Sequence, residues 1–291
     1  MTILTSKNGT LEFGAGHPTA LFNETLGVFD QDPQVLEELR VGQVEKLIEL
    51  AQRGVEVGLQ AVDILIDHPG LNEVELLPKV AKAVSENIGC PISLDSRNPA
   101  ALEAALEAVS PYKCMVNSVS GEPELLNSLL PVVKKYGAAV IAMTMGKTAR
   151  MPRTVEERLA EARAIIETTD GYGIPREDVV FDSMVLATSV EPNSMITTLK
   201  TQQAIIDEFG CSTMLGIGNS GHGMPNPLWI DLSFLLAAIP WGLNAALVHP
   251  DTPGLVDAVL AADFLSNRDP VGEYYIANYR KNNPSRRRRK K

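Results

Sequence analysis

Short apolar runs alternate along the chain with longer segments of helical period. The runs are rich in Val, Ile, Leu, Ala and Met, and residues 138–143 and 179–181 are almost continuously apolar. Such continuity is typical of parallel strands that are covered on both faces. The pattern predicts eight strands, over residues 18–23, 61–66, 91–96, 113–119, 138–144, 178–184, 212–218 and 243–249.

The segments between these runs have the pattern of amphipathic helices. Apolar residues recur at three- and four-residue spacing over 102–109 and 155–166, which predicts a buried stripe on each helix. A capping side chain precedes a proline of the first turn at Asp32-Pro33 and Asn98-Pro99, and glycines suited to helix ends stand at Gly137 and Gly210. We therefore expect one helix between each pair of successive strands along the chain.

Eight strands that alternate with eight helical segments predict parallel βαβ units. A closed (β/α)8 TIM barrel is favoured over an open doubly wound sheet, because the count is eight and no GxGxxG motif follows the first run. We expect one barrel domain over residues 1–270. Residues 271–291 form a C-terminal extension with a basic tail.

Composition agrees with a globular protein of the cytoplasm. The chain has 291 residues, of which 45% are hydrophobic and 21% charged. It has neither a long uncharged apolar segment nor the residue order of a signal peptide, so no membrane association is expected. Cys90, Cys114 and Cys211 are far apart and lie in or beside apolar runs, which predicts buried free thiols.

The charge distribution argues against binding to nucleic acid. The net charge is −10, and Lys281 and the basic run 286–291 hide an even more acidic body. Phosphate binding needs clustered cations, which the body lacks. The residues after Pro284 are expected to form a solvated, mobile tail, and binding of a polyanion by this tail is the less favoured alternative.

Polar residues follow the predicted strands at the end where barrel enzymes carry their active sites. Carboxylates and carboxamides dominate, and they suit a flat heterocycle with N–H and C=O groups along one edge, such as a pterin. Each residue could instead cap a helix or form a turn. Asp63, inside the second strand, is either a structural carboxylate or part of the pocket. The rim positions are Asn23, Asp67, His68, Asp95, Asn117, Thr144, Lys147, Asp182, Asn219, His249 and Asp251.

Other common site chemistries have no matching motif. The chain contains neither a GxSxG elbow nor a GxxxxGK[ST] phosphate loop. The four histidines, His17, His68, His222 and His249, lack the spacing of metal ligands, so we expect no metal site.

Five motifs fall on five successive strand ends in the order of a known family. They are PISLDSRN (91–98), KCMVNS (113–118), IAMTMGKT (141–148), VVFDSMV (179–185) and MLGIGNSGHG (214–223). Over residues 18–267 the chain resembles the pterin-binding methyltransferases, which exchange a methyl group between tetrahydrofolate and a corrinoid protein.

This resemblance implies a substrate, a partner and a set of site residues. The substrate is tetrahydrofolate or 5-methyltetrahydrofolate, the corrinoid (cobalamin) is carried by a partner protein, and the chain forms a homodimer, for which the apolar run 234–242 is the candidate surface. Asn219 approaches N5 and is catalytic. The implied pterin-binding residues are Asp95, Asn117 and Asp182, with Gly216 and Gly218 letting the ring approach the backbone and Asn23 added from the rim.

Two alternatives stay open. Dihydropteroate synthase shares the barrel and the pterin pocket, but it has a basic residue in the loop after the seventh strand. This chain has NSGHG there, without a cation for a diphosphate. After the second predicted strand, this chain has Ile66-Asp67-His68-Pro69, which also departs from the pattern of dihydropteroate synthase. A barrel that binds folate without catalysis is the alternative from another class. Within the methyltransferases, Leu65 and the loop around His222 depart from some members, which leaves the corrinoid partner and the direction of transfer open.

Overall fold

The chain folds into a closed barrel of eight parallel strands. The computed structural model describes residues 1–27, 33–147 and 150–283. Its barrel order is β10-β3-β4-β5-β6-β7-β8-β9, and each predicted run coincides with one strand, so the (β/α)8 prediction is confirmed. The strands are β3 (Ala20–Gly27), β4 (Ala61–Leu65), β5 (Ile92–Asp95), β6 (Met115–Ser120), β7 (Ala139–Met143), β8 (Val179–Asp182), β9 (Ser212–Gly216) and β10 (Ala245–Val248).

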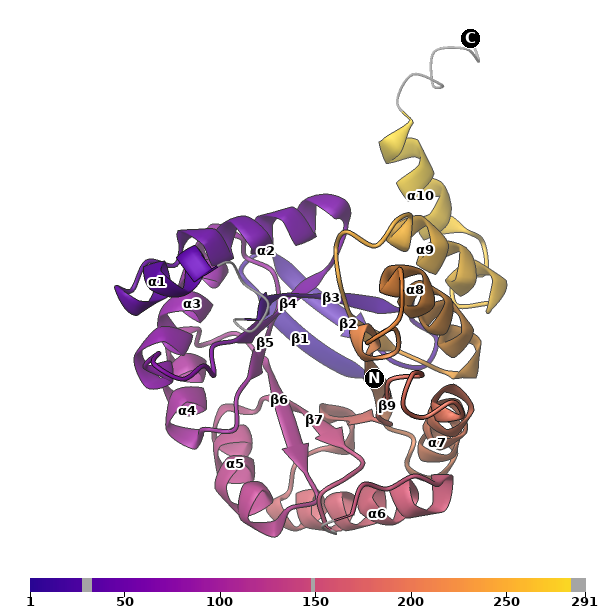
Figure 1. The fold of residues 1–291 in the computed structure, drawn as a ribbon, viewed down its shortest axis with the longest axis horizontal. Coiled ribbons are helices and arrows are strands. Elements are labelled where there is room, and N and C mark those ends of the chain that lie inside the picture. Colours follow the sequence, from indigo (N-terminus) through magenta and orange to yellow (C-terminus); the bar gives the residue numbers. More distant parts are fainter. Residues whose placement is uncertain (28–32, 148–149, 284–291) are drawn as a thin grey trace.

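Helices form a ring around the barrel (Figure 1). As expected, Asn98 Oδ1 caps the fourth helix by accepting from Ala100 N at 3.0 Å, while Gly137 and Gly210 end two helices at φ 61° and 68°. Asp32 lies outside the described residues. The helices are α1 (Pro33–Arg40), α2 (Glu45–Val57), α3 (Glu73–Asn87), α4 (Pro99–Ala108), α5 (Pro123–Tyr136), α6 (Val155–Tyr172), α7 (Ser194–Phe209), α8 (Pro227–Ala238), α9 (Leu255–Leu265) and α10 (Glu273–Asn282).

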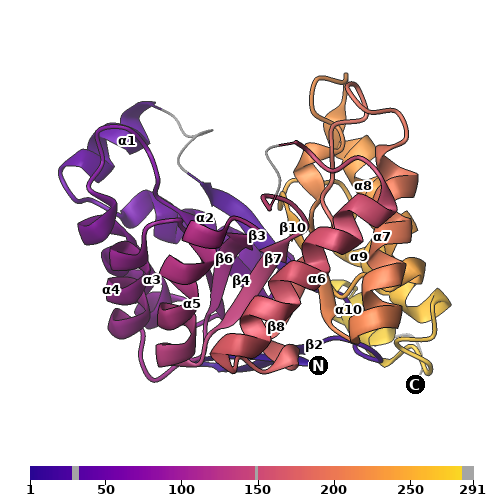
Figure 2. The same ribbon diagram turned by 90° about the horizontal axis from the view of Figure 1, so that it is seen from below.

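An N-terminal hairpin that the sequence analysis did not predict closes one end of the barrel. Strands β1 (Thr2–Ser6) and β2 (Gly9–Phe13) pair antiparallel and lie across the end opposite the site (Figure 2). Leu4 and Phe13 are fully buried in the cluster that fills the barrel interior, and Phe13 meets Phe22 edge to face at 6.1 Å. The Asn8-Gly9 dipeptide between two short runs was the available hairpin signal.

Two further apolar layers pack the helices on the outside of the strands. The run 234–242, which suggested a dimer surface, is largely part of the layer under α8. Phe234, Leu235, Ala238 and Ile239 are all buried. Leu236 and Ala237 of the same run are half-buried and Trp241 is 37% exposed, so only part of the run is available as a surface.

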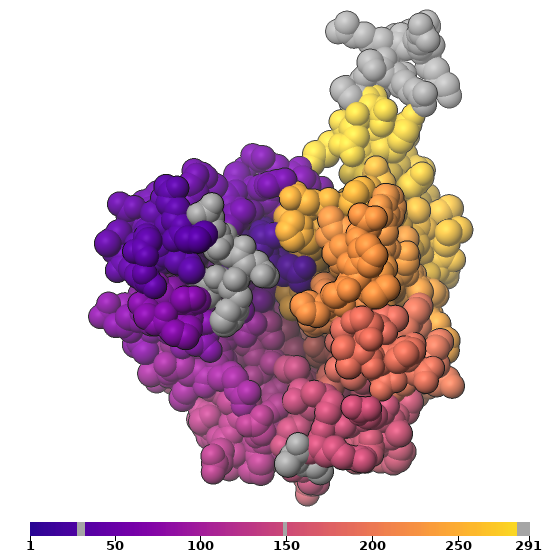
Figure 3. All heavy atoms as spheres, viewed as in Figure 1, coloured from indigo at the N-terminus to yellow at the C-terminus, as the bar shows by residue number. Residues whose placement is uncertain are grey.

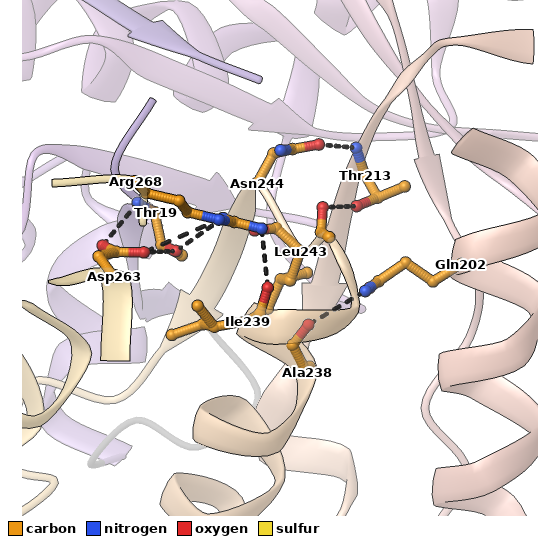
Figure 4. Close-up of polar contacts among 10 residues, drawn as sticks. Thr19, Gln202, Thr213, Ala238, Ile239, Leu243, Asn244, Asp263 and Arg268 are labelled. Carbon is orange, nitrogen blue, oxygen red and sulfur yellow. Dashed lines mark hydrogen bonds and ion pairs between the residues drawn. The ribbon is translucent and has the colours of Figure 1, made fainter. Parts of the chain in front are cut away.

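Buried polar contacts join β3, β9 and β10 at their amino ends (Figure 4). Asp263 accepts hydrogen bonds from Thr19 N and Oγ1 at 2.9 and 2.7 Å. Arg268 donates to Ile239 O at 2.8 Å, and Asn244 accepts from Thr213 N at 2.9 Å. The barrel is thus secured at this end by bonds that leave the carboxyl ends available for a site.

The C-terminal extension is partly helical. Helix α10 packs on α9, where Phe264 and Tyr275 stack at 6.5 Å and Asn278 donates to Asp257 at 2.5 Å. The basic tail, residues 284–291, lies outside the described residues. Across the part of the chain that the structure describes, no helix is long and apolar enough to span a membrane.

Candidate active site

A cavity of about 530 Å³ lies at the carboxyl ends of the strands, where the sequence analysis expected the site. Figure 3 looks onto this end of the barrel, where the amino-terminal part of the chain faces the carboxy-terminal part. Residues of β4 and β5 (Asp63, Asp95) line the cavity together with residues after β9 and β10 (Asn219, His249). A volume of this size suits a small organic ligand.

Two carboxylates and one carboxamide form the buried part of the site. Asn117 Nδ2 donates to Asp63 Oδ1 and Oδ2 at 3.2 and 3.3 Å, and to Asp95 Oδ2 at 3.3 Å. The register of the barrel explains the proximity, because Asp95 and Asn117 are paired across β5 and β6. Asp63 and Asn117 are only 6% and 8% exposed. We call these three residues the carboxylate cluster.

Burial changes the protonation of this cluster. It raises the pKa of Asp63 to about 6, against the opposing hydrogen bonds of Ser93 and Asn117. It also raises the pKa of Asp95 well above its usual value, and the negative charges of Asp63, Asp67 and Glu73 add to that rise. Two carboxylates this close are costly to ionise together. N–H donors of a ligand would stabilise their ionised form.

Asp182 is held at the end of β8 by a separate set of contacts. Its Oδ1 accepts from Met184 N at 2.7 Å. Arg158 of α6 is fully buried and donates to Ser183 O and Met184 O at 2.6 and 2.9 Å. Burial raises the pKa of Asp182 to about 6, while the Met184 N–H and the charge of Arg158 oppose this rise. Asp182 shares the carboxyl end of the barrel with the cluster but does not line the 530 Å³ cavity.

Asn219 stands in the turn after β9. It closes the short 3-10 helix Ile217–Asn219, it is exposed, and its Nδ2 makes only a long contact of 3.5 Å with Gly216 O. It is not among the residues of positive φ, so a left-handed turn does not explain an asparagine here. A Cβ at Gly218 would approach Glu24 Oε1 to 3.0 Å, and Gly216 lines the cavity itself. The turn is therefore tight, with the carboxamide at its surface.

Asn23 is placed differently from the expectation. Strand β3 continues to Gly27 past an irregularity between Asn23 and Leu26, so Asn23 lies within the strand and not at its end. It is fully buried, donates from Nδ2 to Leu50 O at 2.9 Å, and accepts from Thr25 Oγ1 at 2.7 Å. Its amide thus joins β3 to α2, and the structure gives it no place in the cavity wall.

The cavity wall contains residues that the sequence analysis did not single out. Glu24, Thr25 and Arg53 line it, and Arg53 pairs with Asp251, one of the expected rim residues. His249 accepts from Asp251 N at 3.1 Å through Nδ1. The contact between Arg53 and Asp251 spans 198 positions, so no local pattern indicated it.

Other rim positions have structural roles. Thr144 is fully buried and its backbone N donates to Asp182 O at 3.1 Å. The backbone N of Lys147 donates to Glu161 at 2.7 Å. Cys90, Cys114 and Cys211 are buried free thiols, as predicted. Within the described ranges, no group of three or more His, Cys, Asp or Glu side chains is arranged to hold a metal ion.

A (β/α)8 barrel with a polar cavity at the carboxyl ends of its strands has the architecture of a small-molecule enzyme. Residues 32–249 match the model of the pterin binding enzyme family, and the chain belongs to this family.

Two curated relatives are a methyltransferase and a methionine synthase. The chain is 24% identical over 228 residues to the methylcorrinoid:tetrahydrofolate methyltransferase of Eubacterium limosum, covering 77% of this chain and 83% of that protein. It is 26% identical over 220 residues to the methionine synthase of Mycobacterium tuberculosis, which covers 70% of this chain but only 18% of that longer protein.

Solved dihydropteroate synthases share the fold. The Yersinia pestis enzyme with a pterine-sulfa conjugate superposes with a TM-score of 0.69 at 16% identity, over 91% of this chain and 99% of that one. The Coxiella burnetii enzyme in complex with pteroic acid gives 0.70 at 17% identity, with the same coverage. At these identities the likeness concerns the architecture.

Proposed function

We propose that this protein transfers a methyl group between the cobalt of a corrinoid protein and N5 of tetrahydrofolate, in the direction from corrinoid to folate. One observation carries the proposal: the buried carboxylate cluster and the exposed Asn219 line or adjoin a single cavity. The likeness to a methylcorrinoid:tetrahydrofolate methyltransferase supports the choice of reaction.

The cluster suits the amino-pyrimidine edge of a pterin. That edge carries a 2-amino group and an adjacent ring N–H, and a carboxylate can accept from both at once. Asp95 lines the cavity, and Asn117 holds it beside Asp63 through a shared amide. Asp182, with its Oδ1 taken by Met184 N, keeps a second oxygen for a further ring donor. Buried acceptors of this kind select strongly for ligands that satisfy them.

Asn219 is the residue proposed to act on the reacting atom. The corrinoid, carried by its partner protein, would supply the methyl group from cobalt. The lone pair of N5 would bond the methyl carbon while the cobalt–carbon bond breaks with its electron pair left on cobalt. Positive charge would build on N5 until the N5 proton leaves to water. Asn219 Nδ2 faces Gly216 O, and in this proposal the Asn219 Oδ1 accepts a hydrogen bond from the N5 proton. A hydrogen bond that strengthens as this charge develops lowers the barrier.

The exposure of Asn219 and its loop agrees with a macromolecular methyl donor. Residues 222–227 are all exposed around the mouth. A corrinoid protein docked over this end would exclude water from the transfer. No nucleophile from this chain is needed, because the methyl group passes directly between the two substrates.

The decisive experiment combines the protein with tetrahydrofolate and a methylated corrinoid protein. The cobalamin absorption should change as the methyl group leaves, and 5-methyltetrahydrofolate should accumulate. Tight folate binding without any absorption change would favour the binding-only barrel.

Dihydropteroate synthesis is the second candidate, favoured by the structural likeness to those enzymes. The loop over residues 216–226 has neither Lys nor Arg, and a diphosphate needs cationic partners. We expect the pure protein to form no dihydropteroate from a pterin diphosphate and p-aminobenzoate. Robust product formation would overturn the methyltransferase proposal.

We also propose a homodimer, on the strength of the family resemblance. Four residues of the run 234–242 are buried in the core, so the run gives this proposal little support. Light scattering at micromolar concentration tests the assembly, and a monomer would reject it.

A further inference from the structure

One cation stands in the wall of the cavity. Arg53, in the last turns of α2, is the single Lys or Arg among the described residues that line it; Glu24, Asp63, Asp95 and Asp251 are acidic. An isolated guanidinium in an acidic wall would be drawn to its neighbours. It pairs with Asp251, which follows β10 on the other side of β3.

This guanidinium has capacity for a further partner. Its Nη2 bonds Asp251, and in the described part of the chain the structure gives Nε and Nη1 no protein partner. The Arg53 side chain is 56% exposed, so a ligand can reach it. Arginine offers a planar fork of donors that matches a carboxylate.

The position of Arg53 relative to the other site residues points to one part of a folate. The carboxylate cluster lies on β4, β5 and β6, whereas Asn219 follows β9. A pterin with its amino edge at the cluster and N5 toward Asn219 directs the substituent at C6, the neighbour of N5, to the β9–β10–β3 side. Arg53 and Asp251 stand at the rim on that side.

We propose that Arg53 binds a glutamyl carboxylate of the folate substrate and so distinguishes folates from pterins without this tail. This inference rests on the proposed function, because it assumes a pterin in the cavity. The incoming carboxylate shares the guanidinium with Asp251 or displaces it. The cavity therefore has a recognition element at each end: acceptors for the pterin and a cation for the tail.

The test compares 5-methyltetrahydrofolate with the N-methylamide of 5-methyltetrahydropteroate, here called the pteroate ligand, whose benzoyl group carries no free carboxylate. Isothermal calorimetry on the full-length protein should show that the wild type binds the glutamyl ligand more tightly by about fivefold, the value of a well-placed exposed ion pair. Arg53→Gln should abolish this preference while the affinity for the pteroate ligand stays unchanged. The preference should also shrink at high salt, because the pair is exposed.

Two further variants control the result. Arg97 follows Asp95 at the same end of the barrel, is 61% exposed and pairs with Glu122 at 2.8 Å, but it does not line the cavity. Arg97→Gln should keep the full preference. Asp251→Asn removes the competing carboxylate and should keep or increase the preference. If Asp251→Asn abolishes the preference as Arg53→Gln does, the ion pair is only structural and the proposal fails.

The failure of this inference is distinguishable from failure of the proposed function. Binding of the pteroate ligand to the wild type without any preference for the glutamyl ligand would overturn the role of Arg53 alone. If the wild type binds neither ligand, the assignment of the cavity to a pterin is itself wrong.

Discussion

The two sides of the cavity differ in how their polar groups are held. On the β4–β6 side, Asp63 and Asn117 are buried and the cluster is internally hydrogen-bonded. On the β9–β10 side, Asn219 and its loop are exposed, and the Asn219 amide makes one long contact. Preorganised buried acceptors favour binding of a fixed ligand edge, whereas an accessible group can act where a second macromolecule must approach. The difference suggests a division between recognition and chemistry.

The largest expected effect concerns Asn219 and would separate the two sides. Asn219→Ala should reduce the methyl-transfer rate by about a hundredfold to a thousandfold, the usual loss for one transition-state hydrogen bond, while folate affinity changes little. Asn219→Gly should lose the same amount, because the backbone at this position has no need of a left-handed residue. Single-turnover kinetics with a methylated corrinoid protein measure the rate.

A matched control lies away from the mouth. Asn267, after α9, is exposed at φ 59°, a conformation that glycine adopts readily, and it lies outside the cavity. Asn267→Gly should transfer the methyl group at the wild-type rate. A near-wild-type rate for Asn219→Gly would show that Asn219 has no catalytic role. The β9–β10 side of the cavity would then have no assigned part in the chemistry.

The next largest effect is that of Asp63, on the β4–β6 side of the cavity, on the free energy of unfolding. A folded-state pKa of about 6 for Asp63, against 3.8 for a free carboxyl, means that its ionisation opposes folding. The protonated Asp63 side chain contributes stability that is fully present below the unfolded pKa and is lost as pH rises through 6. Asp63→Asn should therefore increase the free energy of unfolding at pH 8 by about 3 kcal/mol, from two pKa units, and by little at pH 4.

Urea unfolding at the two pH values measures this gain. Asp207, exposed on α7, gives the comparison, and Asp207→Asn should change stability by less than about 0.5 kcal/mol at either pH. An equal gain for Asp63→Asn at pH 4 and pH 8 would show that packing, not ionisation, is responsible. Ionisation of Asp63 would then not destabilise the β4–β6 side of the site.

Loss of a single recognition carboxylate should weaken binding by an intermediate amount. Asp95→Ala and Asp182→Ala each leave a ligand donor without its partner, which costs about 1–3 kcal/mol of folate affinity. Calorimetry should show this loss in both variants. Asp67→Ala, at an exposed neighbouring position, should bind almost as the wild type does. Unchanged affinity in both test variants would remove the pterin from this side of the cavity.

The sequence predicted the barrel well because its strands are covered on both faces and therefore almost continuously apolar. It predicted that Asp95, Asn117 and Asn219 lie at the same end of the barrel, because parallel strands bring their carboxyl ends together. It misplaced Asn23, since the irregularity in β3 that extends the strand to Gly27 has no local signature. The pairing of Arg53 with Asp251 depends on tertiary structure alone.

Burial of polar residues was equally hard to foresee. Arg158 lies on a helix whose apolar stripe was predicted, yet the guanidinium is fully buried because it bonds the backbone after β8. A charged residue beside an apolar stripe is more often solvated. The sequence left open whether Asp63 is a structural carboxylate or part of the pocket; Asp63 lines the cavity and contacts Asn117, 54 positions away.

The smallest expected effect is the pH dependence of binding, and it tests whether the cluster recognises its ligand as an anion. N–H donors prefer an ionised acceptor, and the ionised fraction of a carboxyl whose pKa is about 6 falls as pH drops through that value. Folate affinity should then fall by about fourfold between pH 8 and pH 5.5, as expected for one group. Ionisation of the ligand itself also changes affinity with pH, but by the same factor for the wild type and for Asp63→Asn. The difference between their pH profiles of affinity therefore reports the Asp63 carboxyl group. Binding to the variant should vary less with pH, although the remaining carboxylate Asp95 keeps part of the dependence. If affinity instead rises on acidification in the wild type but not in Asp63→Asn, the cluster donates a proton to the ligand as a neutral acid, and the recognised edge is one of acceptors instead of donors.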